Sequence, residues 1–479
     1  MIELLSAYMA PIMFACLVLL MLIGYPVAFA VGANGLLFGA VGIGLGLIEP
    51  SLLQALPERV FGIMFNETLL AIPFFTFMGL ILERSGMAEE LLDTIGQLFG
   101  PVRGGLAYAV IFVGALLAAT TGVVAASVIS MGLISLPIML RYGYDKRLAT
   151  GVIAASGTLA QIIPPSLVLI VLADQMGKSV GDMYAGALLP GLVLTLLYAL
   201  FVFGFSMVKP GAAPALPREA RSLHGSAMLL RIATSLIPPL VLIFLVLGTI
   251  FMGIATPTEG GAMGAVGALV LAIARRRLTL ALLRQAMDRT AKLTSFAIFI
   301  LVGATVFGLV FRGVNGDLWV EHLLLNLPGG QVGFLLVVNL LVFVLAFFLD
   351  FFELSFIVVP LLAPVADKLG IDLIWFGVLL AVNMQTSFMH PPFGFALFYL
   401  RSVAHKSIPT SDIYMGAIPF VGIQLVMVGI VIAFPQLVTG NLHKAKAIDL
   451  DKVRIEVPQS DAPSGESTDQ PAPPPMFRQ

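Results

Sequence analysis

Long apolar stretches dominate the chain, and short polar or Gly- and Pro-rich segments separate them. Apolar segments of about 20 residues, the length of a membrane-spanning helix, recur from Pro11 to Pro435 and leave room for about ten to twelve spans. The N-terminal segment lacks a basic region and a small-residue cleavage pattern, so we interpret it as the first span and not as a signal peptide. The pattern predicts an all-α polytopic membrane protein.

Composition supports this interpretation and excludes several classes of protein. Of 479 residues, 59% are hydrophobic and 11% are charged, whereas soluble domains have about 25% charged residues. The net charge of −1 gives no indication of a nucleic-acid partner. The single cysteine, Cys16, excludes an intrachain disulfide and a cysteine-based metal site. Residues 441–479 are charged and then rich in Pro, Ser and Asp, so we expect a disordered tail there.

The chain contains an internal repeat. A shift of 227 residues aligns Gly86 with Gly313 and Pro164-Pro165 with Pro391-Pro392. Gly, Pro and Asp residues at the boundaries of elements hold this register over roughly a hundred positions, and small offsets extend it at both ends. A register kept at turns and breaks is stronger support for a repeat than identities within apolar stretches, where matches arise by composition alone.

The charges of corresponding loops indicate that the two repeats are inverted. Segment 275–292 carries six basic residues and one acidic residue, whereas its counterpart, 49–67, carries three acidic residues and one basic residue. Cytoplasmic loops are enriched in Lys and Arg, so corresponding loops are predicted to lie on opposite sides of the membrane, as in many secondary transporters. The basic segment 209–231 between the repeats is predicted to be cytoplasmic. This topology places the tail outside, although basic residues follow the last span.

Four polar segments interrupt the apolar sequence: AATTGVVAASVIS (118–130), AASGTLAQIIPPS (154–166), LDFFELS (349–355) and VNMQTSFMHPPFG (382–394). Under the shift the first matches the third, and the second matches the fourth. A proline pair lacks two backbone donors and interrupts a helix, and broken helices within a membrane occur where they are buried or line a cavity. The exposed carbonyl and hydroxyl oxygens suit a cation such as sodium, and half-helix N-termini suit a carboxylate.

Each of these signals also has a structural interpretation. Thr121 and Ser127 could serve only in helix packing, and each proline pair could be a simple kink. Asp350 and Glu353 could be solvated at the mouth of a re-entrant loop, although carboxylates buried in membranes are usually functional. His390 could be a structural histidine that is satisfied by its neighbours.

Several motifs resemble the large membrane subunit of the tripartite ATP-independent periplasmic (TRAP) transporters. They are RYGYD, AASGTLAQIIPPS and DMYAGALLPG in the first half, and GIATPTEGGAMGA, LDFF and GIDLIWFGVLLAVNMQTSFMHPPFG in the second. The resemblance extends from residue 10 to about residue 435. It implies an elevator mechanism driven by a sodium gradient, in which a transport domain slides against a scaffold.

The resemblance also implies partners and a substrate. We expect a separate small membrane subunit with four spans, because no such segment is fused before the first span, and a periplasmic solute-binding protein that delivers a carboxylate. We expect a multi-pass protein of the bacterial inner membrane with no cofactor, sodium being the coupling ion. The 382–394 motif has Gln385 and His390 where many relatives have a Gly-rich stretch and a Thr. Its form resembles a subgroup that transports 2-oxo- or hydroxy-monocarboxylates.

The resemblance assigns roles to particular residues, which lie at the two predicted hairpin tips and in the two predicted broken helices. The expected sodium ligands are Thr121, Ser127, Ser156, Gly157, Thr158, Asp350, Asn383, Gln385 and Thr386, and the expected substrate contacts are Ser387, His390 and Glu353.

The predicted organisation has two inverted repeats, each with an arm and a hairpin followed by a broken helix. The first repeat is 1–208 (arm 51–66, hairpin and broken helix 104–176), the linker is 209–228, the second repeat is 229–440 (arm 278–292, hairpin and broken helix 332–404), and the tail is 441–479. We interpret the arms as amphipathic helices in the membrane interface.

Other classes fit the sequence less well. An enzyme is disfavoured because the chain lacks HExxH, GxSxG and GxGD motifs. A passive channel would not require sodium. A stand-alone sodium/carboxylate symporter of another family would share the inverted hairpins, and it differs in needing no periplasmic protein.

Overall fold

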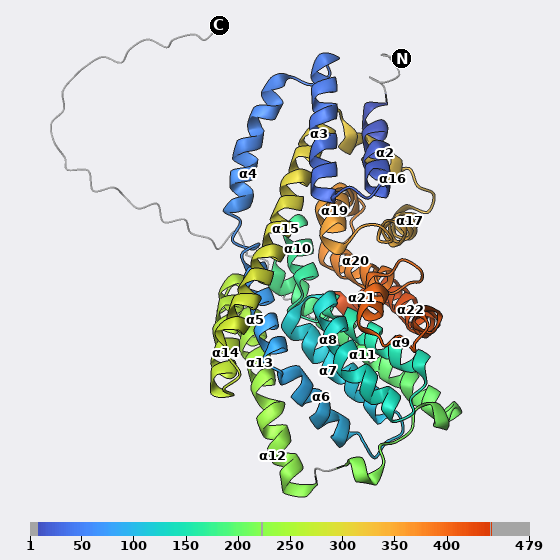
Figure 1. Ribbon diagram of the computed structural model, residues 1–479. Coiled ribbons are helices and arrows are strands. Elements are labelled where there is room, and N and C mark those ends of the chain that lie inside the picture. The colour runs from blue at the N-terminus through green and yellow to red at the C-terminus, as the bar shows by residue number, and fades with distance from the viewer. Residues whose placement is uncertain (1–7, 222–223, 441, 443–479) are drawn as a thin grey trace, which may run out of the picture. The chain divides into compact units, whose positions relative to one another are not determined.

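The computed structural model describes residues 8–221, 224–440 and 442, except for the side chains of Thr120 and Thr121. Throughout these residues the regular structure is helical (Figure 1), as the sequence predicts. The tail predicted over 441–479 lies outside the described residues, apart from Leu442.

Seven segments in the described part are long and apolar enough to cross a membrane, or eight if one bent pair, α16 (Gly316–Leu325) and α17 (Gly330–Leu345), is counted as a span. They are α3 (Val27–Gly44), α8 (Val124–Arg141), α11 (Val180–Val208), α12–α13 (Gly225–Ser235 and Ile237–Phe251), α14 (Pro257–Ala274), α15 (Leu280–Gly313) and α22 (Thr410–Ala433). This number is below the ten to twelve spans that the apolar stretches predict. Three further apolar helices in the described part, α2 (Met9–Leu22), α7 (Gly105–Thr121) and α20 (Leu373–Ser387), are shorter than the segments in this count.

The shorter elements lie between these spans. They are α2 (Met9–Leu22), η1 (Pro50–Ala55), α4 (Leu56–Met64), α5 (Ala71–Arg84), α6 (Met87–Leu98), α7 (Gly105–Thr121), α9 (Lys146–Thr158), η2 (Leu159–Gln161), α10 (Leu167–Gln175), η3 (Pro210–Ala212), η4 (Arg218–Ala220), α16 (Gly316–Leu325), α17 (Gly330–Leu345), α18 (Phe351–Glu353), η5 (Leu354–Val358), α19 (Val359–Lys368), α20 (Leu373–Ser387), α21 (Phe395–Val403) and α23 (Gln436–Thr439).

Two helical hairpins occupy equivalent positions in the two halves. Hairpin 1 consists of α7 and α8, and it turns at Gly122, whose φ of 58° is a left-handed conformation that glycine adopts without steric cost. Hairpin 2 consists of α17 and the continuous α18–η5–α19, and its turn spans residues 346–350. In Figure 1, α17 and α19 of hairpin 2 lie above α7 and α8 of hairpin 1. The sequence repeat thus corresponds to a repeat of structure.

Each half also contains one broken helix. The first runs from α9 through η2 to α10 and is interrupted at residues 162–166, and the second runs from α20 to α21 and is interrupted at 388–394. Pro164-Pro165 and Pro391-Pro392 lie in these interruptions, and each pair is joined by a cis peptide bond. Prolines lack the N–H that would continue the helical hydrogen bonds, which explains why both helices end there.

The hairpins and broken helices pack crosswise. Hairpin 1 contacts α9 and η2 of its own half, and its second arm, α8, contacts α21 of the other half. Hairpin 2 follows the same plan, because α17 contacts α20 while α18 and η5 contact α10. Each hairpin therefore lies against the first part of its own broken helix and the second part of the other.

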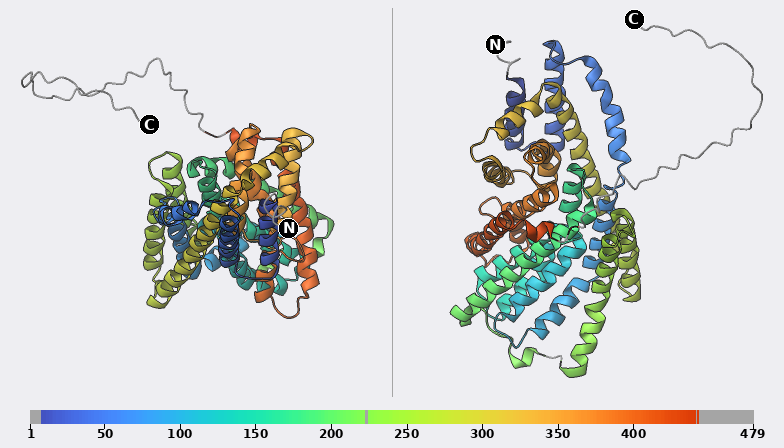
Figure 2. Two further views of the ribbon diagram at one scale, coloured as in Figure 1. Left: turned by 90° about the horizontal axis from the view of Figure 1, so that it is seen from above. Right: turned by 180° about the vertical axis from the view of Figure 1, so that it is seen from behind.

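A second group of helices, which we call the outer helices, consists of α3, α4, α5, α13, α14 and α15. Helix α15 contacts α3, α4 and α5, and α14 contacts α5 and α13 (Figures 1 and 2). At Gly35 an added Cβ would lie 2.8 Å from the backbone nitrogen of Phe307, and at Gly303 an added Cβ would lie 2.6 Å from the carbonyl oxygen of Ala28. Only glycine permits this contact between α3 and α15.

The two predicted arms differ in form. The first, η1 and α4, is a separate exposed segment without a buried residue. The second, 278–292, is not a separate helix: from Leu280 on it forms the first turns of α15, which has 34 residues and continues without a break to Gly313. A helix of this length is about 50 Å long and exceeds a hydrocarbon core of about 30 Å. The charged first turns of α15 can therefore extend beyond the apolar layer.

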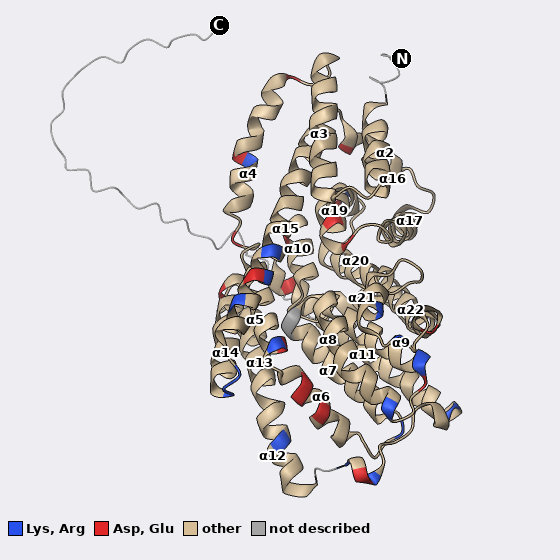
Figure 3. Cartoon of the chain, in the orientation of Figure 1, with Lys and Arg blue, Asp and Glu red and all other residues tan. Residues whose placement is uncertain are grey.

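The linker between the halves lies at the open end of hairpin 1. Gly104 N donates to Ala213 O (2.9 Å), and Asp145 N donates to Ala212 O (2.8 Å). Because of these hydrogen bonds, the basic residues around 141–147 lie at the same end of the molecule as the linker. Long parts of the helices carry no charged residue (Figure 3).

Candidate functional site

The tip of hairpin 2 is built by a reciprocal cap that involves both predicted carboxylates. Asp350 Oδ1 accepts from Phe352 N (2.8 Å) and Glu353 N (3.1 Å), and Glu353 Oε2 accepts from Asp350 N (2.9 Å). This capping box satisfies donors that the start of a helix leaves free. No Lys or Arg in the described part lies within ion-pair distance of either carboxylate. Two neighbouring acids at the tip are therefore held by backbone donors, without a protein cation.

Ser156 and Asn383 are equivalent under the shift, and each joins its broken helix to the first arm of the adjacent hairpin. Ser156 packs on Gly114 of α7, where an added Cβ would lie 2.5 Å from the serine Cβ. Asn383 Nδ2 donates to Asn339 O (2.7 Å) and Asn339 Oδ1 (3.1 Å) in α17. Both residues are buried. The two equivalent positions thus both contact the first arm of a hairpin, but one carries a hydroxyl and the other an amide.

Thr158 and Gln385 are also equivalent, and the structure brings them into contact. Gln385 Nε2 donates to Thr158 Oγ1 (3.3 Å) and to Tyr198 Oη (3.4 Å), while Gln424 Nε2 donates to the same two oxygens (3.3 and 2.7 Å). Residues related by a two-fold axis can touch only where that axis passes between them. This polar cluster therefore marks the pseudo-two-fold axis of the repeats, and the Oε1 atoms of both glutamines have no partner among the described residues.

Two predicted substrate contacts, Ser387 at the end of α20 and His390 in the second break, are close together. Ser387 O accepts from His390 Nδ1 (2.7 Å), so Nδ1 carries a proton, and Nε2 has no partner among the described residues. The imidazole stacks on Phe347 of the hairpin 2 turn, with ring centroids 3.6 Å apart. Thr386 Oγ1 donates to Val382 O within its own helix (3.1 Å). His390 thus connects the break to the hairpin tip.

At hairpin 1 the geometry is set by close packing. A Cβ on Gly157 would lie 3.1 and 3.2 Å from the backbone N and Cα of Val128, so α9 and α8 approach as closely as a glycine allows. Ser127 is buried in the same turn of α8. The side chain of Thr121 is outside the described residues, so its predicted role as a ligand is not addressed by the structure.

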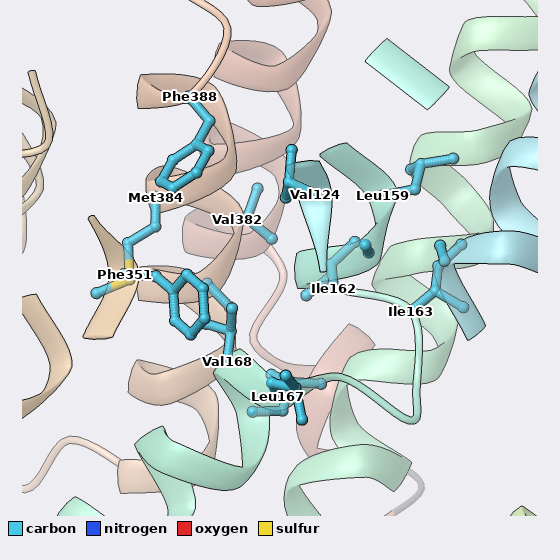
Figure 4. Packing of buried hydrophobic residues seen from close by; sticks show 14 of the residues in the cluster. Val124, Leu159, Ile162, Ile163, Leu167, Val168, Phe351, Val382, Met384 and Phe388 are labelled. Carbon is cyan, nitrogen blue, oxygen red and sulfur yellow. The ribbon is translucent and has the colours of Figure 1, made fainter. Parts of the chain in front are cut away.

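Apolar side chains of both halves fill the space around the breaks (Figure 4). Val124 and Ile162 of the first half and Phe351 and Val382 of the second belong to one buried cluster. This packing excludes water from the polar groups between them, which strengthens their electrostatic interactions.

Sequence reasoning missed three buried polar residues, Tyr198, Gln424 and Gln161. Gln161 lies in a predicted motif, yet it was not assigned a role, and both of its amide atoms lack a partner in the described part. Tyr198 and Gln424 lie within long apolar helices, where an isolated polar residue is a signal of function or of interhelical bonding. That signal would have justified including Tyr198 and Gln424 among the candidate site residues.

The donor set suits some ligands better than others. No group of three His, Cys, Asp or Glu side chains that could hold a metal is present in the described ranges. The available groups are hydroxyl, amide and carbonyl oxygens with two carboxylates. Oxygen ligands of this kind suit hard cations and not soft transition metals.

Comparison with known proteins identifies the family. Residues 14–437 match the family described as tripartite ATP-independent periplasmic transporter, DctM component. The chain is 32% identical, over 391 residues, to the C4-dicarboxylate TRAP transporter large permease protein DctM of Pseudomonas aeruginosa, covering 81% of this chain and 89% of the relative. It is 28% identical, over 416 residues, to the sialic acid TRAP transporter large permease protein SiaM of Vibrio cholerae, covering 85% and 95%.

A solved structure agrees at the level of fold. The Alcanivorax borkumensis YdaH transporter, described as having an unusual topology, superposes with a TM-score of 0.56 at 16% identity, covering 82% of this chain and 91% of that one. The family members are transporter permease components of the inner membrane and not enzymes. The predicted fold class, family resemblance, inner-membrane location and lack of enzymatic function are confirmed. This chain belongs to the DctM family, the large permease component of the tripartite ATP-independent periplasmic transporters.

Proposed function

We propose that this permease couples the inward flow of sodium to the import of a small carboxylate, by an elevator movement of the hairpins and broken helices against the outer helices. The observation that carries the proposal is the pair of repeat-related breaks, whose buried polar groups meet at one pseudo-two-fold axis with a hairpin against each. Two symmetric breaks provide the alternating access that a secondary transporter requires.

The chemistry of hairpin 2 supports sodium as the coupling ion. Asp350 and Glu353 are adjacent acids without a protein cation, and each uses one carboxylate oxygen in the capping box. Like charges at such short range repel each other strongly when little water is present. A bound cation would offset this repulsion, and the second carboxylate oxygens would be free to hold it.

The remaining predicted ligands lie near the C-terminal ends of two repeat-related helices. Ser156, Gly157 and Thr158 lie at the end of α9, and Asn383, Gln385 and Thr386 lie near the end of α20, so both sets are next to a helix interruption, and Gln385 contacts Thr158. We assign sodium binding to these two helix ends together with the hairpin tips.

Movement of the hairpin group is supported by the way the helices are grouped. The outer helices contact one another closely, and the hairpins and broken helices do the same. Two cavities separate parts of these groups, one of about 360 Å³ beside hairpin 1 and one of about 460 Å³ beside hairpin 2, and α15 lines both. Helix α5 contacts α7 of hairpin 1, and the two cavities leave other parts of the boundary unfilled, which is compatible with sliding.

The carboxylate substrate is supported by the named relatives, since C4-dicarboxylates and sialic acid both carry carboxylate groups. TRAP large permeases act with a small membrane subunit and a periplasmic binding protein. We propose that the small subunit has four spans, and that Ser387, His390 and Glu353 contact the substrate near hairpin 2.

The test is uptake by proteoliposomes that contain both membrane subunits. We expect uptake of a carboxylate only when an inward sodium gradient and the cognate binding protein are both present. Uptake that is unchanged when potassium replaces sodium would contradict the coupling. Uptake without the binding protein would instead indicate a stand-alone symporter.

A further inference from the structure

The cavity of about 360 Å³ beside hairpin 1 is lined by residues of opposite charge that do not pair with each other. Glu83 of α5 lies on one wall, and Arg289 and Lys292 of α15 lie on another. Neither base has an acidic group within 4.0 Å in the described part of the chain. The third wall is the first turn of α8, with Ala125 and Ala126. The cavity thus joins two outer helices to the tip of hairpin 1.

The acidic wall has unsatisfied hydrogen-bonding groups. Ser130 Oγ donates to Glu83 Oε1, whereas Glu83 Oε2 is buried without a partner among the described residues. Thr76, which is only 3% exposed, also lines the cavity, and its hydroxyl likewise has no partner there. A buried polar group without a partner is unfavourable. A ligand hydroxyl at this wall would satisfy both groups by donating to Glu83 Oε2 and accepting from Thr76 Oγ1.

The basic wall suits an anion. Arg289 and Lys292 are three residues apart, so they lie on the same face of α15, and a carboxylate between them would be held by two cations. With one acid and two bases, the lining carries a net charge of +1, which one carboxylate neutralises. A second carboxylate would face Glu83 and be repelled.

We propose that Glu83 is a specificity-determining residue, and that this cavity accepts a monocarboxylate with a hydrogen-bond donor such as a hydroxyl while it rejects dicarboxylates. The carboxylate lies against Arg289 and Lys292, and the hydroxyl lies against Glu83. This inference rests on the proposed function, because it assigns the class of solute that passes hairpin 1.

The experiment uses the full chain with its small subunit, carrying Cys16→Ser and a reporter cysteine, Ala126→Cys, in the cavity wall. The rate of maleimide modification is measured against lactate, malate and propionate. Lactate has one carboxylate and a hydroxyl, malate adds a second carboxylate, and propionate lacks the hydroxyl. We expect lactate to protect the cysteine at concentrations at least tenfold below those required of malate, and below those required of propionate.

The variants separate charge from structure. Glu83→Gln keeps the size and an acceptor, and it should reduce the difference between lactate and malate to less than about threefold. Glu89→Gln is the matched control, because Glu89 is exposed on α6 and does not line the cavity. Arg289→Gln with Lys292→Gln should abolish protection by all three anions.

Several outcomes would overturn the inference. Equal protection by lactate and malate in the parent protein excludes selection by charge, and this comparison stands even if Glu83→Gln fails to fold. A Glu83→Gln protein that keeps the tenfold difference excludes Glu83 as its source. Protection that survives loss of Arg289 and Lys292 indicates that they only anchor α15 at the membrane surface. Absence of protection by any anion excludes the cavity as a solute site, while sodium-dependent uptake would still support the proposed function.

Discussion

Replacing Asp350 by asparagine separates the two roles that the structure gives this residue, as a helix cap and as a proposed sodium ligand. Asparagine is about as good an N-cap as aspartate, whereas alanine costs about 1 kcal/mol. Asp350→Asn should therefore leave hairpin 2 intact and remove only the charge. Asp350→Ala should remove the charge and also the two hydrogen bonds to Phe352 N and Glu353 N.

The expected effect on sodium follows from the charge. A cation about 4 Å from a carboxylate gains roughly 4 kcal/mol at an effective dielectric constant of about 20. Desolvation offsets part of this gain, and a remainder of about 1.4 kcal/mol would already correspond to a tenfold change in affinity. We therefore expect Asp350→Asn to raise the sodium concentration for half-maximal uptake at least tenfold and to lower the Hill slope.

The assay is sodium-dependent uptake in proteoliposomes supplied with the binding protein. Asp372→Asn is a matched control, because Asp372 is an exposed N-cap that accepts from Trp375 N (2.8 Å) at the start of α20, remote from the hairpin tip in sequence. Thermal stability in detergent should be unchanged in both asparagine variants and lowered in Asp350→Ala. If half-saturation and slope are normal in Asp350→Asn while the protein is well expressed, Asp350 is only a cap.

Two further predictions concern packing and topology. Gly157→Ala should abolish uptake, since its Cβ has no room against the backbone of α8. Gly204→Ala is the control: nothing lies within 4 Å of the added Cβ, so uptake should be unchanged and α11 should be stabilised by up to about 1 kcal/mol. Loss of uptake in both variants would show that steric contact is not the cause. In a Cys16→Ser background, Arg284→Cys and Glu58→Cys should react with an impermeant maleimide from opposite sides of the membrane. Reaction of both from one side would refute the inverted topology.

The sequence was sufficient to locate the hairpins and breaks because their boundaries carry residues with strict backbone requirements. Gly122 turns hairpin 1 through a left-handed conformation, and the proline pairs lack donors, so both are visible in a one-dimensional pattern. Hydropathy measures apolar length and does not show where an apolar helix stops, so it does not separate the long spans from the shorter apolar helices α2, α7 and α20. The sequence also did not show that the second arm continues directly into α15, since no residue in 278–292 signals the end of a helix.

The partners of the polar side chains could be predicted only in part. Thr158 and Gln385 were both selected from their motifs, but their mutual contact depends on the pseudo-two-fold axis that folding creates. Tyr198 and Gln424 complete the same cluster from helices that were classified only by their apolar character. A contact made by residues more than 180 positions apart is a property of topology, and local patterns do not encode it.

The repeat explains how one backbone plan supports two different hairpins. Under the 227-residue shift, Asp350 and Glu353 at the tip of hairpin 2 correspond to Val123 and Ala126 at the tip of hairpin 1. Hairpin 1 therefore brings no charge to its own cavity, and the only acid lining that cavity among the described residues is Glu83, from an outer helix. If the outer helices remain in place while the hairpins move, a solute released beside hairpin 1 leaves the carboxylates of hairpin 2 and meets a different set of charges. Under the proposals above, the two hairpins would then present different charges to the solute while they share the same fold.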